Sequence, residues 1–207
     1  MDIPDKVINR LTLYHYILDD FDDDSVESIS STQIADLLNI DDSQVRKDIK
    51  YLNNTGKCRV GYNIKELKLS IEHTLGFAKP KDVFIIGSGN LGSALAKYDS
   101  FSNYGLNTLA MFDVDPFKVG LTINNKEVFH VSKLPNLVQR LNVNFAILTV
   151  PRKYAQESAN YLANSGIKYI WNFTPCILKV PKDVKVWNEN LIGSFLQFTK
   201  KDIEEVV

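Results

Sequence analysis

Three glycines in the pattern GxGxxG follow an apolar run, and residues of these types at this spacing can bind a dinucleotide. Gly87, Gly89 and Gly92 come directly after residues 83–86, and residues 93–98 continue with helical spacing. In such a strand–turn–helix unit the first glycine permits the tight turn, the second lets a pyrophosphate approach the backbone, and the third lets the helix pack on the strand. The unpaired N–H groups of the first helical turn then hold the phosphate charge. The predicted phosphate-binding residues are Gly87, Ser88, Gly89, Asn90, Leu91 and Gly92.

An acidic residue, Asp113, ends the next apolar run, 109–112. An acid at the end of the second strand accepts hydrogen bonds from ribose hydroxyls and repels a 2′-phosphate, so it favours NAD(H) over NADP(H). A GxGxxG pattern by itself is weak, because ordinary turns also contain glycines. Here the strand, helix, second strand and terminal acid occur together, which favours a dinucleotide or another adenine nucleotide over a plain turn.

The sequence after residue 80 alternates between strand-like and helix-like segments, which predicts a parallel sheet with right-handed crossovers. After Asp113 the predicted strands cover residues 127–131, 144–150, 167–171 and 184–187. Helices are predicted over residues 133–141 and 152–164. Because ligands bind at the carboxyl ends of such strands, the residues there are expected to meet the glycine turn in one crevice. They are Thr149, Val150, Pro151, Asn172 and Phe173.

The first 80 residues have the pattern of a small helical DNA-binding module. Apolar periodicity predicts helices over residues 6–18, 32–38, 43–52 and 65–75. Ser30 with Gln33 and Asp41 with Gln44 fit capping boxes at the starts of the second and third of these helices. Two short helices joined by a tight turn, followed by a short strand or wing over residues 57–64, predict a winged helix-turn-helix.

The outer face of the third helix and the wing carry side chains that could reach phosphates and base edges. These are Gln44, Arg46, Lys47, Lys50 and Tyr51 on the helix, and Lys57, Arg59 and Tyr62 on the wing. Residues 41–68 contain seven Lys or Arg against four Asp or Glu, although residues 1–80 contain ten against fourteen. Phosphate neutralisation depends on local charge, so this segregation favours DNA binding over the alternative of a solvated basic helix face.

Composition limits the other possibilities. The 207 residues are 44% hydrophobic and 24% charged with a net charge of −1, so the chain can bury a core and shows no global excess of positive charge. Cys58 and Cys176 belong to no CxxC or Cys/His cluster, so we predict no metal site and two free thiols in a reducing compartment. Because no apolar run has membrane length and the start lacks the features of a signal peptide, a cytoplasmic protein is expected.

Residues 189–207 predict a final helix with Leu191, Phe195 and Phe198 at spacings of four and three. This apolar face needs a partner that the predicted sheet does not obviously supply. It can pack on a second subunit or on its own domain, and the pattern alone leaves both possibilities open.

Taken together, these segments resemble the Rex family of redox-sensing transcriptional repressors over essentially the whole chain. The matching motifs are RL (10–11) with Tyr14, SS (30–31), QVRKD (44–48), VGY (60–62), GSGNLG (87–92), FDVDP (112–116), KVG (118–120), VP (150–151), and GIK (166–168) with NF (172–173) and Pro175. The resemblance implies a homodimer in which NADH loosens binding to a double-stranded operator, expected to be palindromic and AT-rich. It also adds Ser31 as a DNA contact, and Tyr98 and Lys118 as contacts to NAD(H).

The predicted fold class is therefore α/β. We expect a winged-helix DNA-binding domain over residues 1–80, a Rossmann-type parallel-sheet dinucleotide-binding domain over 81–188, and a C-terminal helix over 189–207 exchanged with the partner subunit.

The chain departs from the family pattern where the redox state is sensed. The resemblance implies joint action of an arginine in the first helix, a tyrosine after the glycine helix and an aspartate that opens the last helix. Tyr98 is present, but Tyr16 and Asn190 replace the two charged residues. A weaker preference for NADH over NAD is therefore expected. The recognition helix (IKYLN, 49–53) and the wing (CRVGY, 58–62) also depart from the pattern, so operator preference is expected to differ.

Two alternatives to an NADH-sensing repressor follow from the same residues. The first is an NAD(P)-dependent oxidoreductase, which needs a proton donor or acceptor and a substrate domain. His15, His73 and His130 lie in predicted elements away from the crevice, and no substrate domain is left over, so no catalytic residue is predicted. The second is a Rex-like repressor that responds to another adenine nucleotide, such as ADP or coenzyme A, with weak discrimination between NADH and NAD.

Overall fold

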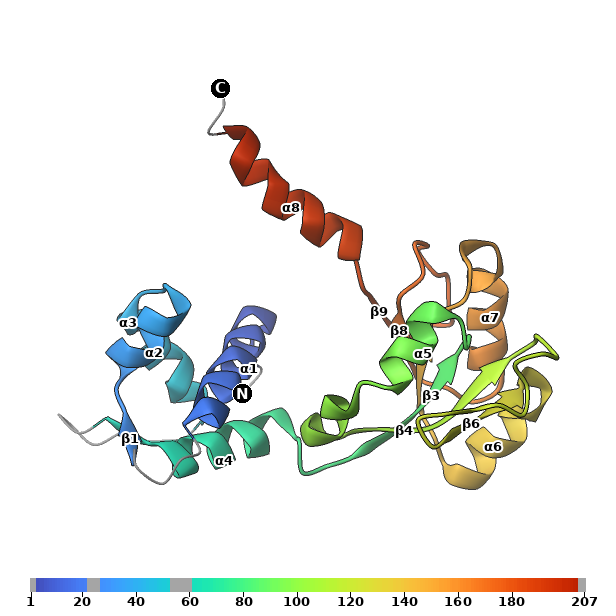
Figure 1. Ribbon diagram of the computed structural model, residues 1–207, viewed down its shortest axis with the longest axis horizontal. Helices are drawn as coiled ribbons and strands as arrows, with labels where there is room; N and C mark the ends of the chain where they lie inside the picture. Colours follow the sequence, from blue (N-terminus) through green and yellow to red (C-terminus); the bar gives the residue numbers. More distant parts are fainter. Residues whose placement is uncertain (1–2, 22–26, 53–60, 205–207) are drawn as a thin grey trace. The chain divides into compact units, whose positions relative to one another are not determined.

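A computed structural model describes residues 3–21, 27–52 and 61–204 of the chain (Figure 1). Two compact units are present, unit 1 over residues 1–79 and unit 2 over residues 80–207. Half of the predicted wing, including Lys57, Cys58 and Arg59, lies outside the described residues, so its expected role stays a prediction.

Unit 1 is built from short helices and a two-stranded antiparallel ribbon. Its elements in the described residues are α1 (Asp5–Asp20), β1 (Ser28–Ile29), α2 (Ser31–Leu38), α3 (Asp42–Ile49), the 3-10 turn η1 (Lys50–Leu52), β2 (Tyr62–Asn63) and α4 (Ile64–Leu75). One apolar cluster joins them, and its largest fully buried members are Tyr14, Leu11, Leu18, Ile29, Ile34, Ile49, Leu67 and Ile71. The helical spacing of Ile34, Leu37 and Leu38 predicts one apolar face for α2, but Leu37 is 58% exposed, whereas Ile34 and Ala35 are buried.

One of the two capping boxes that the sequence predicts in unit 1 is present in the structure. Ser30 and Gln33 form the predicted capping box, in which each side chain bonds the other residue's backbone N–H. Asp41 caps α3 by accepting from the Ser43 N–H at 2.8 Å, but Gln44 does not complete a second box, so that prediction is wrong. The physical reason is that the Gln44 amide bonds a buried carboxylate further along the helix.

The third helix ends earlier than predicted. The α-helical turn stops at Ile49 and tightens into η1, which buries Leu52. The Leu52 carbonyl then accepts a hydrogen bond from the Ser70 hydroxyl of α4 at 2.8 Å, so the end of the helix is tied to the core. α4 itself ends at Gly76 in the left-handed conformation, as its sequence predicts.

Unit 2 contains one seven-stranded sheet in the order β5-β6-β4-β3-β7-β8-β9, parallel except for β5. Its strands are β3 (Lys81–Ile86), β4 (Leu106–Asp113), β5 (Thr122–Ile123), β6 (Lys126–His130), β7 (Phe145–Leu148), β8 (Tyr169–Asn172) and β9 (Lys185–Asn188). Its helices are α5 (Asn90–Ala96), α6 (Leu134–Leu141), α7 (Arg152–Asn164) and α8 (Leu191–Glu204), with 3-10 segments η2 (Asp99–Tyr104) and η3 (Val131–Lys133).

Successive side chains of β3 point to opposite faces of the sheet, so the core of unit 2 has two layers. Phe84 and Ile86 point into a cluster with residues of α6 and α7, whereas Val83 and Ile85 pack with Ala96 of α5 on the other face. Helices therefore cover both faces of a mostly parallel sheet, which is the predicted Rossmann-type architecture. The strand order reverses at β3, because β4 lies on one side and β7 on the other, so β3 marks the crevice where such sheets bind ligands.

A hairpin that the sequence pattern did not predict adds the antiparallel edge. β5 pairs with β6 through a turn at Asn124 and Asn125, whose φ angles of 45° and 61° suit the tight turn of a two-residue hairpin. A strand of two residues has no periodicity, so only the Asn-Asn pair could have indicated it.

Candidate nucleotide and DNA sites

The glycine turn after β3 has the geometry that its spacing predicts. Gly87 has a φ of +97°, and its N–H donates to the Phe112 carbonyl of β4 at 2.8 Å. A Cβ on Gly92 would lie 2.0 Å from the Gly87 carbonyl oxygen, so only glycine allows this close approach of α5 to the turn. A Cβ on Gly89 would meet nothing within 4 Å. The protein leaves space at Gly89, which is where a pyrophosphate needs to approach the backbone.

Asp113 at the end of β4 is held by hydrogen bonds from the glycine turn and from its own loop. Its Oδ2 accepts from the Ser88 N–H at 2.8 Å and from the Ser88 hydroxyl at 2.7 Å. Its Oδ1 accepts from the N–H groups of Val114 and Asp115 at 2.8 and 3.0 Å. Lys118 Nζ lies 3.4 Å from Oδ2, which gives the carboxylate a cationic neighbour.

These contacts keep Asp113 ionised. Burial of the side chain disfavours the charge and would raise its pKa, but hydrogen bonds from Asp115 and Ser88 and the charge of Lys118 outweigh burial and lower the pKa to about 2. A carboxylate that stays ionised can accept hydrogen bonds from ribose hydroxyls and repels a 2′-phosphate.

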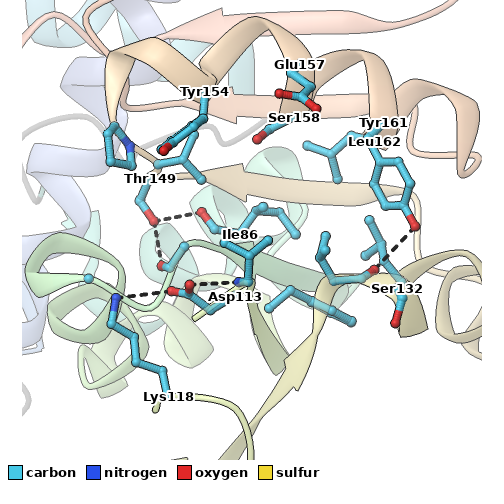
Figure 2. Close-up of a pocket in the computed structure, with 18 of the residues that line it drawn as sticks. Ile86, Asp113, Lys118, Ser132, Thr149, Tyr154, Glu157, Ser158, Tyr161 and Leu162 are labelled. Atoms are coloured by element: carbon cyan, nitrogen blue, oxygen red, sulfur yellow. Dashed lines mark hydrogen bonds and ion pairs between the residues drawn. The ribbon is translucent and has the colours of Figure 1, made fainter. Parts of the chain in front are cut away.

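A pocket of about 930 Å³ opens at the carboxyl ends of β3, β4 and β7 (Figure 2). Eight of the predicted nucleotide contacts line it, namely Gly87, Gly89, Asn90, Asp113, Lys118, Thr149, Val150 and Pro151. Thr149 connects β7 to the glycine turn at the bottom of the pocket. Its hydroxyl is within hydrogen-bond distance, 3.0 Å or less, of the Ile86 and Gly87 carbonyl oxygens. The pocket is large enough for the adenosine part of a nucleotide, in the size range usual for ligand sites.

The pocket continues past the predicted residues along α7. Figure 2 shows Tyr154, Glu157 and Ser158 on this helix, across the pocket from Asp113 and Lys118. These three residues, together with Ser132 and Tyr161, were not predicted from the sequence. The only signal for the four residues of α7 was position, since this helix begins directly after Pro151 at the end of a strand, whereas Ser132 lies in η3 after β6.

Other predicted contacts lie outside this pocket lining. Ser88 and Gly92 support the turn as described above, and Leu91 is a half-exposed residue of α5. Asn172 is fully buried, and its amide is used within the protein: Nδ2 donates to the Cys176 carbonyl and to Asn188 Oδ1, while Oδ1 accepts from Thr174. Phe173 packs on Trp171 with ring centroids 4.8 Å apart. Asn172 therefore shapes the loop after β8, and its contact with a nucleotide stays a prediction.

Tyr98 begins a row of aromatic side chains on the α5 side of the sheet. It is 55% exposed and lies edge-on to Phe101 at 4.8 Å, and Phe101 is 5.9 Å from Trp171. Trp171 Nε1 donates to Glu189, the residue before Asn190. Asn190 Oδ1 in turn accepts from the Gly193 N–H at 2.9 Å, so it caps the start of α8.

The basic side chains of α3 lie at the surface of unit 1. Lys47 and Lys50 are exposed, and Arg46 pairs with Asp42 one turn earlier while its Nη1 lies 3.3 Å from the Ser31 hydroxyl. Tyr62 on β2 is half-buried, and burial raises its pKa although the Arg46 charge opposes the shift. Arg46, Ser31 and Tyr62 are therefore grouped at one end of α3, with Lys47 and Lys50 on its exposed side.

Two residues predicted to face outward from α3 are not fully exposed. Gln44 is partly buried and donates to Asp48 Oδ1 at 2.8 Å. Tyr51 is partly buried and packs against the core of unit 1, because the 3-10 turn rotates it away from the outer face. Asp48 receives further bonds from Arg10 and Tyr14, and these hydrogen bonds lower its pKa despite the opposing effect of burial.

Two family models match the chain in the order of its units. The model described as "Putative DNA-binding protein N-terminus" matches residues 2–49, and the model described as "CoA binding domain" matches residues 78–176. The redox-sensing transcriptional repressor Rex of Clostridium botulinum (strain Hall) is 39% identical over 93% of this chain and 92% of that protein. The Rex protein of Treponema denticola is 42% identical over 91% of this chain and 90% of that protein.

The chain belongs to the Rex family. Solved structures agree with this assignment. A structure of the Rex-family repressor RSP in complex with β-NAD⁺ and operator DNA superposes with a TM-score of 0.89 at 36% identity, and it covers 100% of this chain and 95% of that one. RSP in complex with β-NADH gives a TM-score of 0.85 at 38% identity, with 100% and 97% coverage. The Rex relatives are named as repressors, so the chain is placed with regulators and not with the oxidoreductases.

Membership of the Rex family also identifies the α/β fold class with an N-terminal DNA-binding unit and a Rossmann-type unit. Among the described residues of this Rex-family chain, no helix has the length and hydropathy needed to cross a bilayer. Within the same residues, no group of three or more His, Cys, Asp or Glu side chains is arranged to hold a metal ion.

Proposed function

We propose that this protein is a homodimeric, cytoplasmic transcriptional repressor that binds a palindromic, AT-rich operator and releases it when NADH occupies the pocket at the glycine turn. The observation that carries the proposal is the arrangement of Gly89 and Asp113. Open space above the backbone of Gly89 and an ionised acceptor at Asp113 lie at the two positions that a pyrophosphate and an adenosine ribose require.

The residues of unit 2 divide the task of holding NAD(H). The turn at residues 87–90 and the start of α5, which has no side-chain cap, face the phosphates. Asp113 faces the adenosine ribose, and the part of the pocket lined by Val150, Tyr154 and Leu134 receives the base. When bound, NAD(H) would supply the redox signal, because its oxidised and reduced rings differ in charge. Tyr98, Asn172 and Phe173 are proposed contacts near the nicotinamide half.

Unit 1 supplies the DNA-binding surface. The exposed cations Lys47 and Lys50 neutralise phosphates, Arg46 and Ser31 act at the end of α3, and Lys57, Arg59 and Tyr62 act from the wing. The relative RSP has been solved with β-NAD⁺ and operator DNA together, which supports a DNA-bound state that contains the oxidised cofactor. NADH must therefore bind the DNA-releasing arrangement better than the DNA-bound one.

The exposed apolar side chains of α8 support the dimer. Leu191, Ile192, Phe195, Leu196 and Phe198 are each more than half exposed in the single chain. An apolar surface of this kind on a surface helix marks an interface, and exchange of α8 with a second subunit would bury it.

Fluorescence anisotropy on a labelled AT-rich palindrome, with and without NADH, tests the proposal. We expect binding in the absence of nucleotide or with NAD, and release with NADH at concentrations near its dissociation constant. ADP, coenzyme A and NADPH should be compared in the same titration, because release by ADP or coenzyme A alone would favour the alternative adenine-nucleotide sensor. Oxidation of NADH in the presence of carbonyl compounds would instead indicate an oxidoreductase.

A further inference from the structure

Asp48 is a buried carboxylate on the third helix, with a side chain that is only 1% exposed. Three side chains donate four hydrogen bonds to it. Arg10 donates from Nε at 2.6 Å and from Nη2 at 2.8 Å, Tyr14 donates from its hydroxyl at 2.7 Å, and Gln44 donates from Nε2 at 2.8 Å. A buried charge requires such compensation, and the two-pronged arginine contact fixes direction as well as distance.

These residues form two pairs, each spaced by one helical turn. Arg10 and Tyr14 lie four residues apart on α1, and Gln44 and Asp48 lie four residues apart on α3. Residues with this spacing share one face of a helix. Two successive turns of α1 therefore hold one carboxylate of α3, and Gln44 holds the same carboxylate from the preceding turn of α3, so the side chain of Asp48 is fixed from both helices.

The two faces of α3 consequently have different environments. Asp48 faces α1 and receives the amide of Gln44 from its own helix, whereas Lys47 and Lys50 are exposed to solvent. A glutamine that reads adenine uses its NH₂ group as a donor and its oxygen as an acceptor at once. One of the two N–H groups of Gln44 is committed to Asp48, and this bond directs the amide toward the buried carboxylate and not toward the exposed side of α3.

We propose that Asp48, Arg10, Tyr14 and Gln44 form a clamp that positions α3 for operator binding, and that Gln44 is a positioning residue of this clamp and not a base-reading residue. This inference rests on the proposed DNA binding by unit 1. Contacts to base edges lose strength when a donor moves by a few tenths of an ångström or tilts, so the angle of α3 controls affinity. The clamp acts through the exposed side chains of the same helix, which make the contacts with DNA.

The test uses the full-length protein with Gln44→Met and Tyr14→Phe, each of which removes one donor to Asp48 while keeping much of the side-chain volume. Lys47→Met is the matched control, because it removes a functional group of the exposed face of the same helix. Each variant is titrated with a library of palindromes in which one half-site position at a time is changed. Thermal unfolding and NADH titration confirm that both units are folded.

We expect Gln44→Met and Tyr14→Phe to weaken binding by about tenfold or more for every palindrome, as loss of a hydrogen bond to a charged group would do. The order of preference among base pairs should stay that of the wild type. Lys47→Met should reduce the slope of log K against log salt by about 0.9 for each phosphate that the lysine neutralises, without a change in unfolding temperature.

Two outcomes would overturn the clamp. In one, Gln44→Met changes the preferred base pair at one half-site position, which identifies Gln44 as a base reader. In the other, both clamp variants are folded and bind every palindrome within twofold of the wild type. If the wild-type protein binds no palindrome, the proposed function fails instead, so the two failures are distinguishable.

Discussion

The hydroxyl of Ser88 lies 2.7 Å from Oδ2 of Asp113, and the Ser88 N–H donates to the same oxygen. The second residue of the glycine turn thus holds the acid that ends the neighbouring strand. The position proposed to meet the phosphates and the position proposed to meet the ribose are therefore linked directly by two hydrogen bonds.

This arrangement predicts how stability depends on pH. The pKa of Asp113 falls from 3.8 to about 2 on folding. Because the folded-state value is depressed, the stabilisation is present above the unfolded pKa and is lost as pH falls through the folded pKa, from about 4 to about 2. At pH 6 the free energy of unfolding of the wild type should be about 2 kcal/mol higher than that of Asp113→Asn. This difference should become smaller below pH 4.

Urea unfolding followed by tryptophan fluorescence measures this difference, since Trp171 and Trp187 both lie in unit 2. If the difference in free energy of unfolding between the wild type and Asp113→Asn stays constant from pH 6 to pH 3, ionised Asp113 does not stabilise the sheet. Asp82→Asn is a suitable control because this residue lies at the start of β3, away from the pocket.

Two glycines of the turn should respond differently to alanine. Gly89→Ala should change the free energy of unfolding by less than about 1 kcal/mol, because a Cβ there meets nothing and φ is −72°. It should nevertheless weaken NADH binding at least tenfold, since the methyl group occupies the space for the pyrophosphate. Gly92→Ala should destabilise the fold by about 3 kcal/mol or more, because its Cβ would overlap the Gly87 carbonyl.

Melting curves and NADH titrations of the two variants check this contrast. A Gly89→Ala protein that binds NADH as the wild type does would place the phosphates elsewhere in the pocket.

The neutral residues Tyr16 and Asn190 should reduce discrimination between NADH and NAD. Calorimetry should give an affinity ratio well below a thousandfold, a value that corresponds to about 4 kcal/mol. Restoring the family's charges with Tyr16→Arg and Asn190→Asp together should increase the preference for NADH. Aspartate also caps helices, so Asn190→Asp should retain the bond to the Gly193 N–H and serve as the single-variant control. A wild-type ratio in the thousands would refute this expectation.

The apolar face of α8 should control assembly. Phe195→Asp with Phe198→Asp should convert the dimer into a monomer in light scattering and lower operator affinity at least tenfold, because a palindrome needs two linked reading heads. Gln197→Asp places the same charge at an exposed polar position of α8 and should leave the dimer intact. Dimers that persist in the double phenylalanine variant would mean that α8 packs on its own subunit.

Much of unit 2 could be predicted because its local signals agree with its long-range packing. The helix Arg152–Asn164 lies where periodicity, Pro151 and Gly166 place it, and Gly87, Gly89 and Asp113 meet because parallel strands bring their carboxyl ends together. Gln44 illustrates what the sequence could not reveal. A polar residue on a short helix suggests an exposed side chain, but its partner Asp48 is buried by Arg10, which lies 38 residues earlier in the chain.

The same limit explains Asn172, a buried amide that bonds Asn188 at the end of β9 and Thr174 in the segment after β8, which no periodicity predicts. It also explains why the pocket wall at Tyr154 and Glu157 was not predicted, since a helix that merely begins at a strand end does not indicate which of its faces borders a ligand.

The central position of β3 affects the order in which the chain becomes native during synthesis. β3 pairs with β7, and the Thr149 hydroxyl donates to the Gly87 carbonyl across 62 residues. All residues of the apolar cluster of unit 1 have been synthesised once residue 75 has left the ribosome. In unit 2, one edge of β3 lacks its partner strand until β7 emerges. Long-range parallel pairing is slow and leaves apolar edges uncovered. We therefore expect a nascent chain to carry a native amino-terminal head while its unfinished sheet still depends on chaperones.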